Sequence, residues 1–452
     1  EFGRLVLTAM STLTRTQATW RRLFTQAGFP SYFLGMFVSL FGSGLNFAGV
    51  TLYVLAKTGS TVQVSFSIIL LTLPRLIVPL FGGVLTDRMD RRYLGITLDL
   101  VRAAIVLGAA VLAATSHLEM WQLYLMVLLL GAAFAVYWST SLAMLQEIVP
   151  PLHLLGANAA VLVAVQGGML LAGTVVGFIY ERAGLAPILA IDGATYLISA
   201  FCFYRLRSGY AAPSRADKSP SAATTVETEP DAEDEAILAL DTSDPSPAVL
   251  ADITEGLRYL RAHPSILALG LTNSVMMAGV ISANVIVVAM SHDLFHAGAR
   301  GYGFLQAGWA LGAVAGGLIA LSLPRRYPRG LLMAALAVLA VGHALLPFAG
   351  VIAVAVAMNM VFGACRAVGS VLTQSSILKV VPQHLMGRTQ SAFAVIATVL
   401  QIVTSFILGW LAEHTSLQIA FVLLGLLYGT AVLAAIRATG LQSSPARQSI
   451  AD

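Results

Sequence analysis

The sequence predicts an all-α integral membrane protein in which twelve transmembrane helices form two six-helix bundles. Hydrophobic residues make up 58% of the 452-residue chain and charged residues only 11%, whereas roughly 25% of the residues in a soluble domain are charged. Apolar runs close to the ~20-residue length that crosses a bilayer recur along the chain. Short motifs of the first half also return in the second half, which indicates a duplicated architecture.

The twelve expected spans are apolar runs bounded by charged or turn-forming residues. They cover residues 31–56, 62–85, 94–115, 121–143, 155–180, 186–206, 265–290, 302–323, 330–347, 351–376, 388–411 and 416–438. The chain then divides into an N-terminal segment (1–30), an N-terminal bundle (31–207), a linker (208–250), a short helix (251–263), a C-terminal bundle (264–440) and a tail (441–452).

The linker is rich in acidic residues and prolines and poor in apolar residues, so it is expected to be disordered. Behind it, the segment 251–263 places Ile253, Leu257 and Leu260 on one helical face. That pattern is typical of a helix lying at the membrane interface.

Two motif pairs relate the halves. GGVLTDRMDRRY at 82–93 and GGLIALSLPRRY at 316–327 share Gly-Gly and Arg-Arg-Tyr. PLHLLG at 151–156 and PQHLMG at 382–387 share Pro, His, Leu and Gly. Both pairs fall at equivalent points of a six-plus-six arrangement, which favours two bundles of common origin.

The basic residues of the short loops set the orientation. On one side of the expected membrane lie Arg88, Arg91, Arg92, Arg205, Arg207, Arg325, Arg326, Arg329, Lys379 and Arg388, whereas the other side holds chiefly Lys57, Arg182 and Arg300. Basic loops mark the cytoplasmic face, so both termini are expected in the cytoplasm, and the membrane is expected to be a bacterial-type plasma membrane. The basic face also suits contact with anionic lipids.

The stretch GVLTDRMDRR at 83–92 resembles the signature of the major facilitator superfamily, G-x-L-x-D-R-x-G-R-[RK], between spans two and three. Asp90 replaces the signature's second glycine, which is similar to the macrolide-efflux and enterobactin-exporter branch. The resemblance implies the major facilitator fold and a conformational latch that holds the outward-facing state. Its members would be Gly83, Asp87, Arg88, Arg91 and Arg92, with Glu147 and Arg388 on the receiving side.

The resemblance also implies a secondary transporter that exports an amphiphilic small molecule by alternating access, with multidrug efflux and siderophore export the nearest roles. Such a protein is commonly an antiporter, and protons are a candidate coupling ion. Span four lacks the buried arginine of many proton-coupled members of the family, so the coupling ion stays open.

Two arginines are expected deep in the membrane. Arg75 precedes Asp87 by 12 residues and Arg366 precedes Lys379 by 13 residues, which places each ~18–20 Å from the loop at ~1.5 Å per residue. A charge at that depth faces a cavity or a partner. Either reading is open for these two: an internal ion pair, or contact with an anionic group of the cargo.

Asp99 and Arg102 stand three residues apart on one helix and are expected to pair. Asp192 is expected near the outer end of span six. The uncharged candidates for the cavity are Asn46, Tyr137, Trp138, Gln166, Asn273, Met276, Met277, Asn284, Gln306, Trp309, Asn359 and Gln401.

Other functions find little support in the sequence. There is no Gly-Lys dipeptide for a phosphate-binding loop, and neither H-E-x-x-H nor G-x-S-x-G occurs. We therefore expect no enzyme, no cofactor, no metal site and no nucleic-acid partner, and we expect a monomer. A lysophospholipid transporter and a ligand sensor built on a transport fold remain as alternatives.

Overall fold

The computed structural model describes residues 23–26, 28–78, 89–150, 153–206, 245–322 and 328–442. All regular secondary structure within these ranges is helical. Twelve of the described helices are long and apolar enough to cross a membrane. This confirms the predicted fold class.

The N-terminal half is built from six long helices, of which α3 continues as a second helical stretch. They are α2 (Phe29–Thr58), α3 (Thr61–Thr72), α5 (Arg91–Ala114), α6 (Met120–Ile148), α7 (Leu154–Ala183) and α8 (Leu185–Arg205). Within this half, α2 packs between α7 and α8, and α5 packs along α8. These contacts place α2 and α8 at the centre of the half.

The C-terminal half repeats the pattern. Its helices are α11 (Pro264–Ala289), continued by the π-helical turn η4 (Met290–Leu294), α12 (Gly298–Ser322), α13 (Pro328–Leu345) with the 3₁₀ turn η5 (Leu346–Phe348), α14 (Ile352–Val380), α15 (Gln383–His414) and α16 (Leu417–Gln442). The motifs at 151–156 and 382–387 both lie between the fourth and fifth spans of their halves. They therefore occupy equivalent places.

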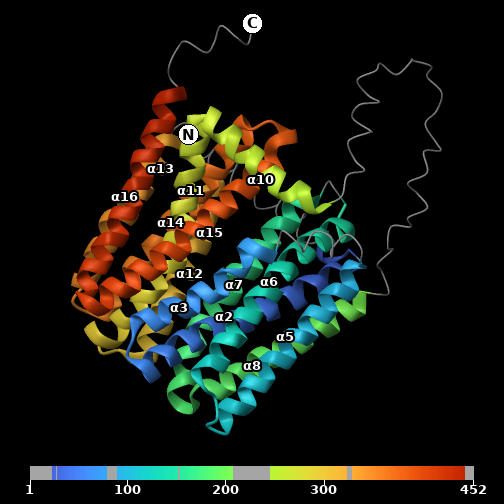
Figure 1. Ribbon diagram of the computed structural model, residues 1–452, viewed down its shortest axis with the longest axis vertical. Coiled ribbons are helices and arrows are strands. Elements are labelled where there is room, and N and C mark those ends of the chain that lie inside the picture. The colour runs from blue at the N-terminus through green and yellow to red at the C-terminus, as the bar shows by residue number, and fades with distance from the viewer. Residues whose placement is uncertain are drawn as a thin grey trace, which may run out of the picture.

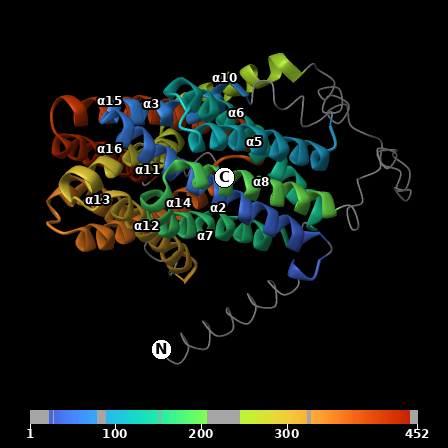
Figure 2. The ribbon, with the colours of Figure 1, turned by 90° about the horizontal axis from the view of Figure 1, so that it is seen from below.

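The two halves lie side by side with their helices roughly aligned, as Figures 1 and 2 show. Two helix pairs carry most of the contact between them, α7 with α12 and α3 with α15. The largest group of buried apolar residues contains members from both halves. The interface between the halves is therefore continuous with the core.

The helix α10 (Pro245–Ala262) packs against α15. It begins six residues earlier than the predicted helix, inside the range assigned to the linker, and a proline at its first position suits a helix start. Leu260 is buried against α11 and α15, while Leu257 is 38% exposed. Only part of the predicted apolar face is therefore covered by protein.

The second span is interrupted at Leu73, and a helical turn then resumes from Pro74 to Val78. Proline lacks the backbone N–H that would bond to the carbonyl of Leu70, so the regular ladder breaks there. Arg75 follows directly after this break. The break thus sits where the chain brings a charged side chain to the space between the halves.

Candidate functional site

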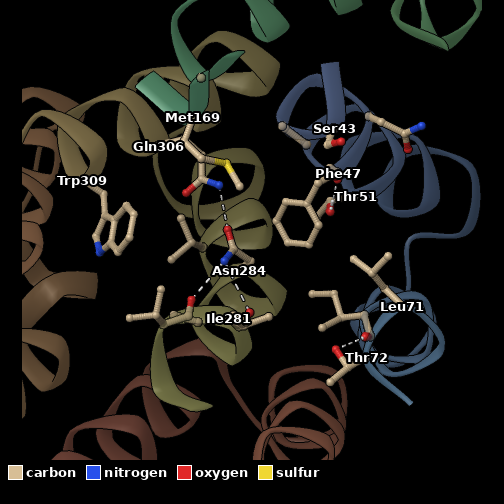
Figure 3. Close-up of a pocket in the computed structure, with 18 of the residues that line it drawn as sticks. Ser43, Phe47, Thr51, Leu71, Thr72, Met169, Ile281, Asn284, Gln306 and Trp309 are labelled. Atoms are coloured by element: carbon tan, nitrogen blue, oxygen red, sulfur yellow. Dashed lines mark hydrogen bonds between the residues drawn. The ribbon is translucent and has the colours of Figure 1, made fainter. Parts of the chain in front are cut away.

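A cavity of about 380 Å³ lies between the two halves, within the size range of small-molecule sites. Side chains from both halves line it. Figure 3 shows one part, with Phe47 of α2 opposite Asn284 of α11, and Gln306 and Trp309 of α12 beside them. Apolar residues make up the larger part of its lining, and polar side chains from both halves lie among them.

The structure brings most of the predicted cavity residues together. Asn46, Arg75, Gln166, Met277, Asn284, Gln306, Trp309, Asn359 and Arg366 all line this cavity. Five others, Tyr137, Trp138, Asn273, Met276 and Gln401, do not line it. Trp138 stacks on Phe134, with 6.0 Å between the ring centroids, and Phe134 itself faces the cavity. Gln401 donates from Nε2 to Thr72 Oγ1 at 2.6 Å and so joins α15 to α3.

The two deep arginines reach the cavity from opposite halves. The Arg75 guanidinium lies 5.6 Å from the centre of the Phe134 ring, and Arg366 contacts the sulfur of Met277. The Nε of Arg366 is buried and has no hydrogen-bond partner in the described part of the chain. None of the described residues that line the cavity is Asp or Glu. The cavity therefore presents positive charge that no lining carboxylate offsets.

A polar group on the C-terminal side joins three residues. The Asn284 Oδ1 accepts from Gln306 Nε2 at 2.8 Å and from Tyr302 Oη at 3.1 Å, as the dashed line to Gln306 in Figure 3 shows. The Asn284 amide donates to the carbonyl of Val280 at 3.0 Å. These bonds fix the Gln306 side chain at the cavity wall.

His343, which lies within the ninth span, was not singled out in the sequence analysis. Its Nδ1 lies 2.8 Å from the carbonyl of Leu339, and its ring stacks between Phe362 and Tyr428 at centroid distances of 4.3 and 4.9 Å. Both His343 and Tyr428 line the cavity. A lone histidine within an apolar run was the available signal.

Asp99 and Arg102 pair in a fully buried position behind the cavity. The rings of Tyr137 and Tyr196 cover the Arg102 guanidinium at 3.9 and 4.3 Å. Neither member of the pair lines the cavity, so a molecule in the cavity would not contact either charged group directly.

Asp192 belongs to this buried cluster too. Its Oδ2 accepts from Asn46 Nδ2 at 2.6 Å, and Asn46 lines the cavity. The sequence placed Asp192 near the outer end of its span and did not relate it to a cavity. The structure places it one side chain behind the cavity wall.

One end of the molecule is closed by contacts between α3 and α15. The Glu413 Oε2 accepts from Ser60 Oγ at 2.5 Å and from the Val62 backbone N–H at 2.9 Å. The Thr61 hydroxyl donates to the carbonyl of Gly409 at 2.7 Å. A carboxylate of one half thus caps a helix N-terminus of the other, a favourable place for negative charge.

The second contact at this closed end joins α7 to α12. A Cβ on Gly177 would lie 2.5 Å from the carbonyl oxygen of Ala299, and one on Gly303 would lie 2.6 Å from that of Gly173. The backbones therefore approach as closely as glycine permits. Glu181 and Arg300 add an ion pair of 2.5 Å across the same seam.

The predicted latch lies partly outside the described residues, which do not include Gly83, Asp87 and Arg88. Of the others, Arg91 pairs with Glu147 at 2.7 Å and Arg388 pairs with Glu255 at 2.7 Å. The first contact joins α5 to α6 within the N-terminal half, and the second joins α15 to α10.

Arg92 donates from Nε and Nη2 to the carbonyls of Phe203 and Tyr204, each at 3.0 Å. These carbonyls belong to the last turn of α8, where a cation satisfies groups that the helix leaves unpaired. Asp90, the departure from the signature, caps α5 by accepting from the Arg92 backbone N–H at 2.9 Å. The aspartate therefore has a local structural role that glycine could not supply.

The family model described as Major Facilitator Superfamily matches residues 32–327. The chain belongs to this superfamily. It is a membrane transporter that resembles the macrolide-efflux branch, since it is 23% identical over 318 residues to macrolide efflux protein A of Streptococcus pyogenes. That alignment covers 70% of this chain and 71% of the relative.

Solved structures support the same fold at low identity. A POT family transporter in complex with 5-aminolevulinic acid has a TM-score of 0.66 at 11% identity, with 93% of this chain and 97% of that chain covered. The nucleoside transporter NupG has a TM-score of 0.63 at 14% identity, with 92% and 98% covered. These likenesses extend the major facilitator fold over nearly the whole chain.

Proposed function

We propose that this chain exports an amphiphilic molecule with an acidic group by alternating access, through the cavity between its halves. The observation that carries this proposal is the presence of one arginine from each half, Arg75 and Arg366, among apolar walls that hold no described acidic side chain. An ionised group inside a membrane protein needs a partner or a cavity. An acidic cargo would supply the partner, and the apolar walls would receive its hydrocarbon part.

The orientation follows from the basic loops. The end that carries Arg91, Arg92, Arg205 and Arg388 is the cytoplasmic one by the positive-inside rule. The closed end with Ser60, Glu413, Glu181 and Arg300 would then face outward. Alternating access requires the contacts at the closed end to separate while the cytoplasmic ends approach each other.

The direction of transport rests on the resemblance to a macrolide efflux protein and on charge. A membrane potential that is negative inside favours the outward movement of an anion by about 2.3 kcal/mol per 100 mV. A proton gradient is a second possible source of energy. We propose a monomer in a bacterial-type plasma membrane, with drug-like and siderophore-like acids as the substrate class.

The test is transport in proteoliposomes, with matched anionic and cationic fluorescent amphiphiles. A potential and a pH gradient are imposed separately. A charged hydrogen bond contributes about 1.5–3 kcal/mol, so Arg75→Ala and Arg366→Ala should each lower the apparent affinity for the anion roughly 10- to 100-fold. Arg182→Ala, at the end of α7 and outside the cavity lining, is the matched control and should transport normally.

Three outcomes would contradict the proposal. Transport of the cation with no dependence on either arginine would make both arginines structural. Binding of the anion without movement would favour a ligand sensor. Movement of lysophospholipids alone, with the same dependence on the arginines, would favour the lipid transporter over an exporter of soluble amphiphiles.

A further inference from the structure

Two buried carboxylates share a single buried guanidinium behind the cavity wall. Asp99 and Asp192 have no exposed surface, and Arg102 is 1% exposed. Arg102 donates to Asp99. Asp192 lies close enough for the charge of Arg102 to act on it as well. With all three side chains ionised, this cluster would carry one net negative charge.

The surrounding helices do not neutralise that charge. Around Asp192, α2 contributes Asn46 and α8 contributes Tyr196, while α5 contributes Asp99 and Arg102. Tyr137 of α6 covers the far side of Arg102. The helix α7 also touches α8 but forms no ion pair with the cluster in the described part of the chain.

An unbalanced charge in such a place is costly. The penalty for burying one uncompensated ion is several kcal/mol even after relaxation. A buried group in that position takes up a proton and becomes neutral instead. The arrangement of two acids and one base therefore accommodates one exchangeable proton in the conformation seen here.

The hydrogen bonds distinguish the two carboxylates. Asp99 is bonded directly to the Arg102 cation, which stabilises its ionised form. Asp192 is bonded to the neutral amide of Asn46, which carries no charge to balance its own. One oxygen of each carboxylate, Asp99 Oδ2 and Asp192 Oδ1, has no hydrogen-bond partner in the described part of the chain. The bond of Asp99 to the Arg102 cation is therefore the difference that favours the proton on Asp192.

We propose that Asp192 is the proton-binding site of this transporter and that its protonation is linked to cargo binding through Asn46. The role of Asp192 in transport rests on the proposed function. The presence of a proton on its carboxyl group does not. Asn46 is the physical link, because the same side chain bonds to Asp192 and lines the cavity.

The link works through the amide of Asn46. An ionised Asp192 accepts from Nδ2, as the structure shows, which leaves the amide oxygen free for a donor on the cargo. A protonated Asp192 can donate instead, and a turned amide would then offer its N–H groups to the cavity. Loss or gain of the proton thereby changes what Asn46 offers to the cargo.

A short polar path connects the site to the cavity. The hydroxyls of Ser43 and Tyr196 lie 3.0 Å apart, and both residues line the cavity while Tyr196 also adjoins Asp192. Gly42 lets α2 pack closely against the site, because a Cβ there would lie 2.6 Å from Asp192 Oδ1. Protons need cross only one layer of side chains.

The first experiment detects the proton directly and needs no transport. Infrared difference spectroscopy of the purified full chain should show the carbonyl stretch of a protonated carboxyl group that disappears in Asp192→Asn. Asp293→Asn, an exposed acid, is the matched control and should keep the band. Asp99→Asn is the second variant, since one acid and one base remain and Asp192 should then ionise, so the band should vanish here too.

The second experiment measures the linkage. An anionic fluorescent amphiphile is added to the chain in weakly buffered detergent, and proton release or uptake is recorded with a pH indicator. Wild type should exchange up to one proton per bound probe, and Asp192→Asn should bind the probe with almost no exchange. Release would indicate antiport, and uptake would indicate movement of proton and cargo together.

The proposal is overturned if the band persists in Asp192→Asn, or if Asp192→Asn exchanges as many protons as wild type. Failure of the transport proposal looks different. Wild type would then move neither amphiphile in proteoliposomes, while the carboxyl band of Asp192 would still be observed.

Discussion

The contact between Glu413 and the start of α3 should control how often the closed end opens. In Glu413→Ala, the Ser60 hydroxyl and the Val62 N–H lose an acceptor contributed by the other half. Losing a helix cap costs about 0.5–2 kcal/mol. Because Glu413 is exposed to solvent, a value near 1 kcal/mol is the reasonable choice.

A change of about 1 kcal/mol multiplies the ratio of open to closed molecules roughly fivefold. The Thr61–Gly409 bond and the Glu181–Arg300 pair remain in this variant. The opening should therefore become more frequent without becoming permanent. The expected result is a partial shift in population and not a new dominant structure.

The assay is the distance distribution between two spin labels, measured by double electron–electron resonance. Labels on His117→Cys and Thr415→Cys report on opposite halves at the closed end, in a chain whose Cys202 and Cys365 are replaced by alanine. Tyr124→Phe is the matched control, because it removes a bond to Gln63 within the N-terminal half alone. An identical distribution for Glu413→Ala and its parent would refute the reasoning.

Two further predictions concern stability. Gly42→Ala should lower the free energy of unfolding by about 1–3 kcal/mol, because the new methyl group meets Thr195 and Asp192, whereas Gly108→Ala meets nothing within 4 Å and should be neutral or stabilising. Thermal unfolding in detergent compares the two, and equal melting temperatures would contradict the packing argument. Arg92→Ala should cost about 2 kcal/mol through loss of the bonds to the end of α8, and Arg92→Lys should recover only part of it since lysine lacks the planar pair of donors. Full recovery by lysine would show that charge alone matters.

The number of spans and the depth of the arginines could be predicted from the sequence. Both depend on lengths along the chain: a span needs ~20 apolar residues, and a residue advances a helix by ~1.5 Å. The same lengths brought Arg75 and Arg366 to the level of one cavity. The pairing of Asp99 with Arg102 is likewise local, since residues three apart share a helix face.

Which face of each helix meets the cavity was not readable from the sequence. Trp138 and Gln401 are polar or aromatic residues at the right depth, but α6 and α15 turn them toward Phe134 and Thr72. In a membrane protein most apolar residues can face either lipid or protein, so periodicity does not distinguish the two environments. The tertiary arrangement alone decided these positions.

The sequence by itself determined that the chain spans a membrane and that it has twelve spans, because these follow from composition and from distances along the chain. Tertiary structure decided that Asp192 lies behind the cavity wall, that Asn46 connects it to the cavity, and that Glu413 caps a helix of the other half. Each of these contacts joins residues more than 140 positions apart. Such contacts depend on how helices pack across the molecule, and no local pattern records that.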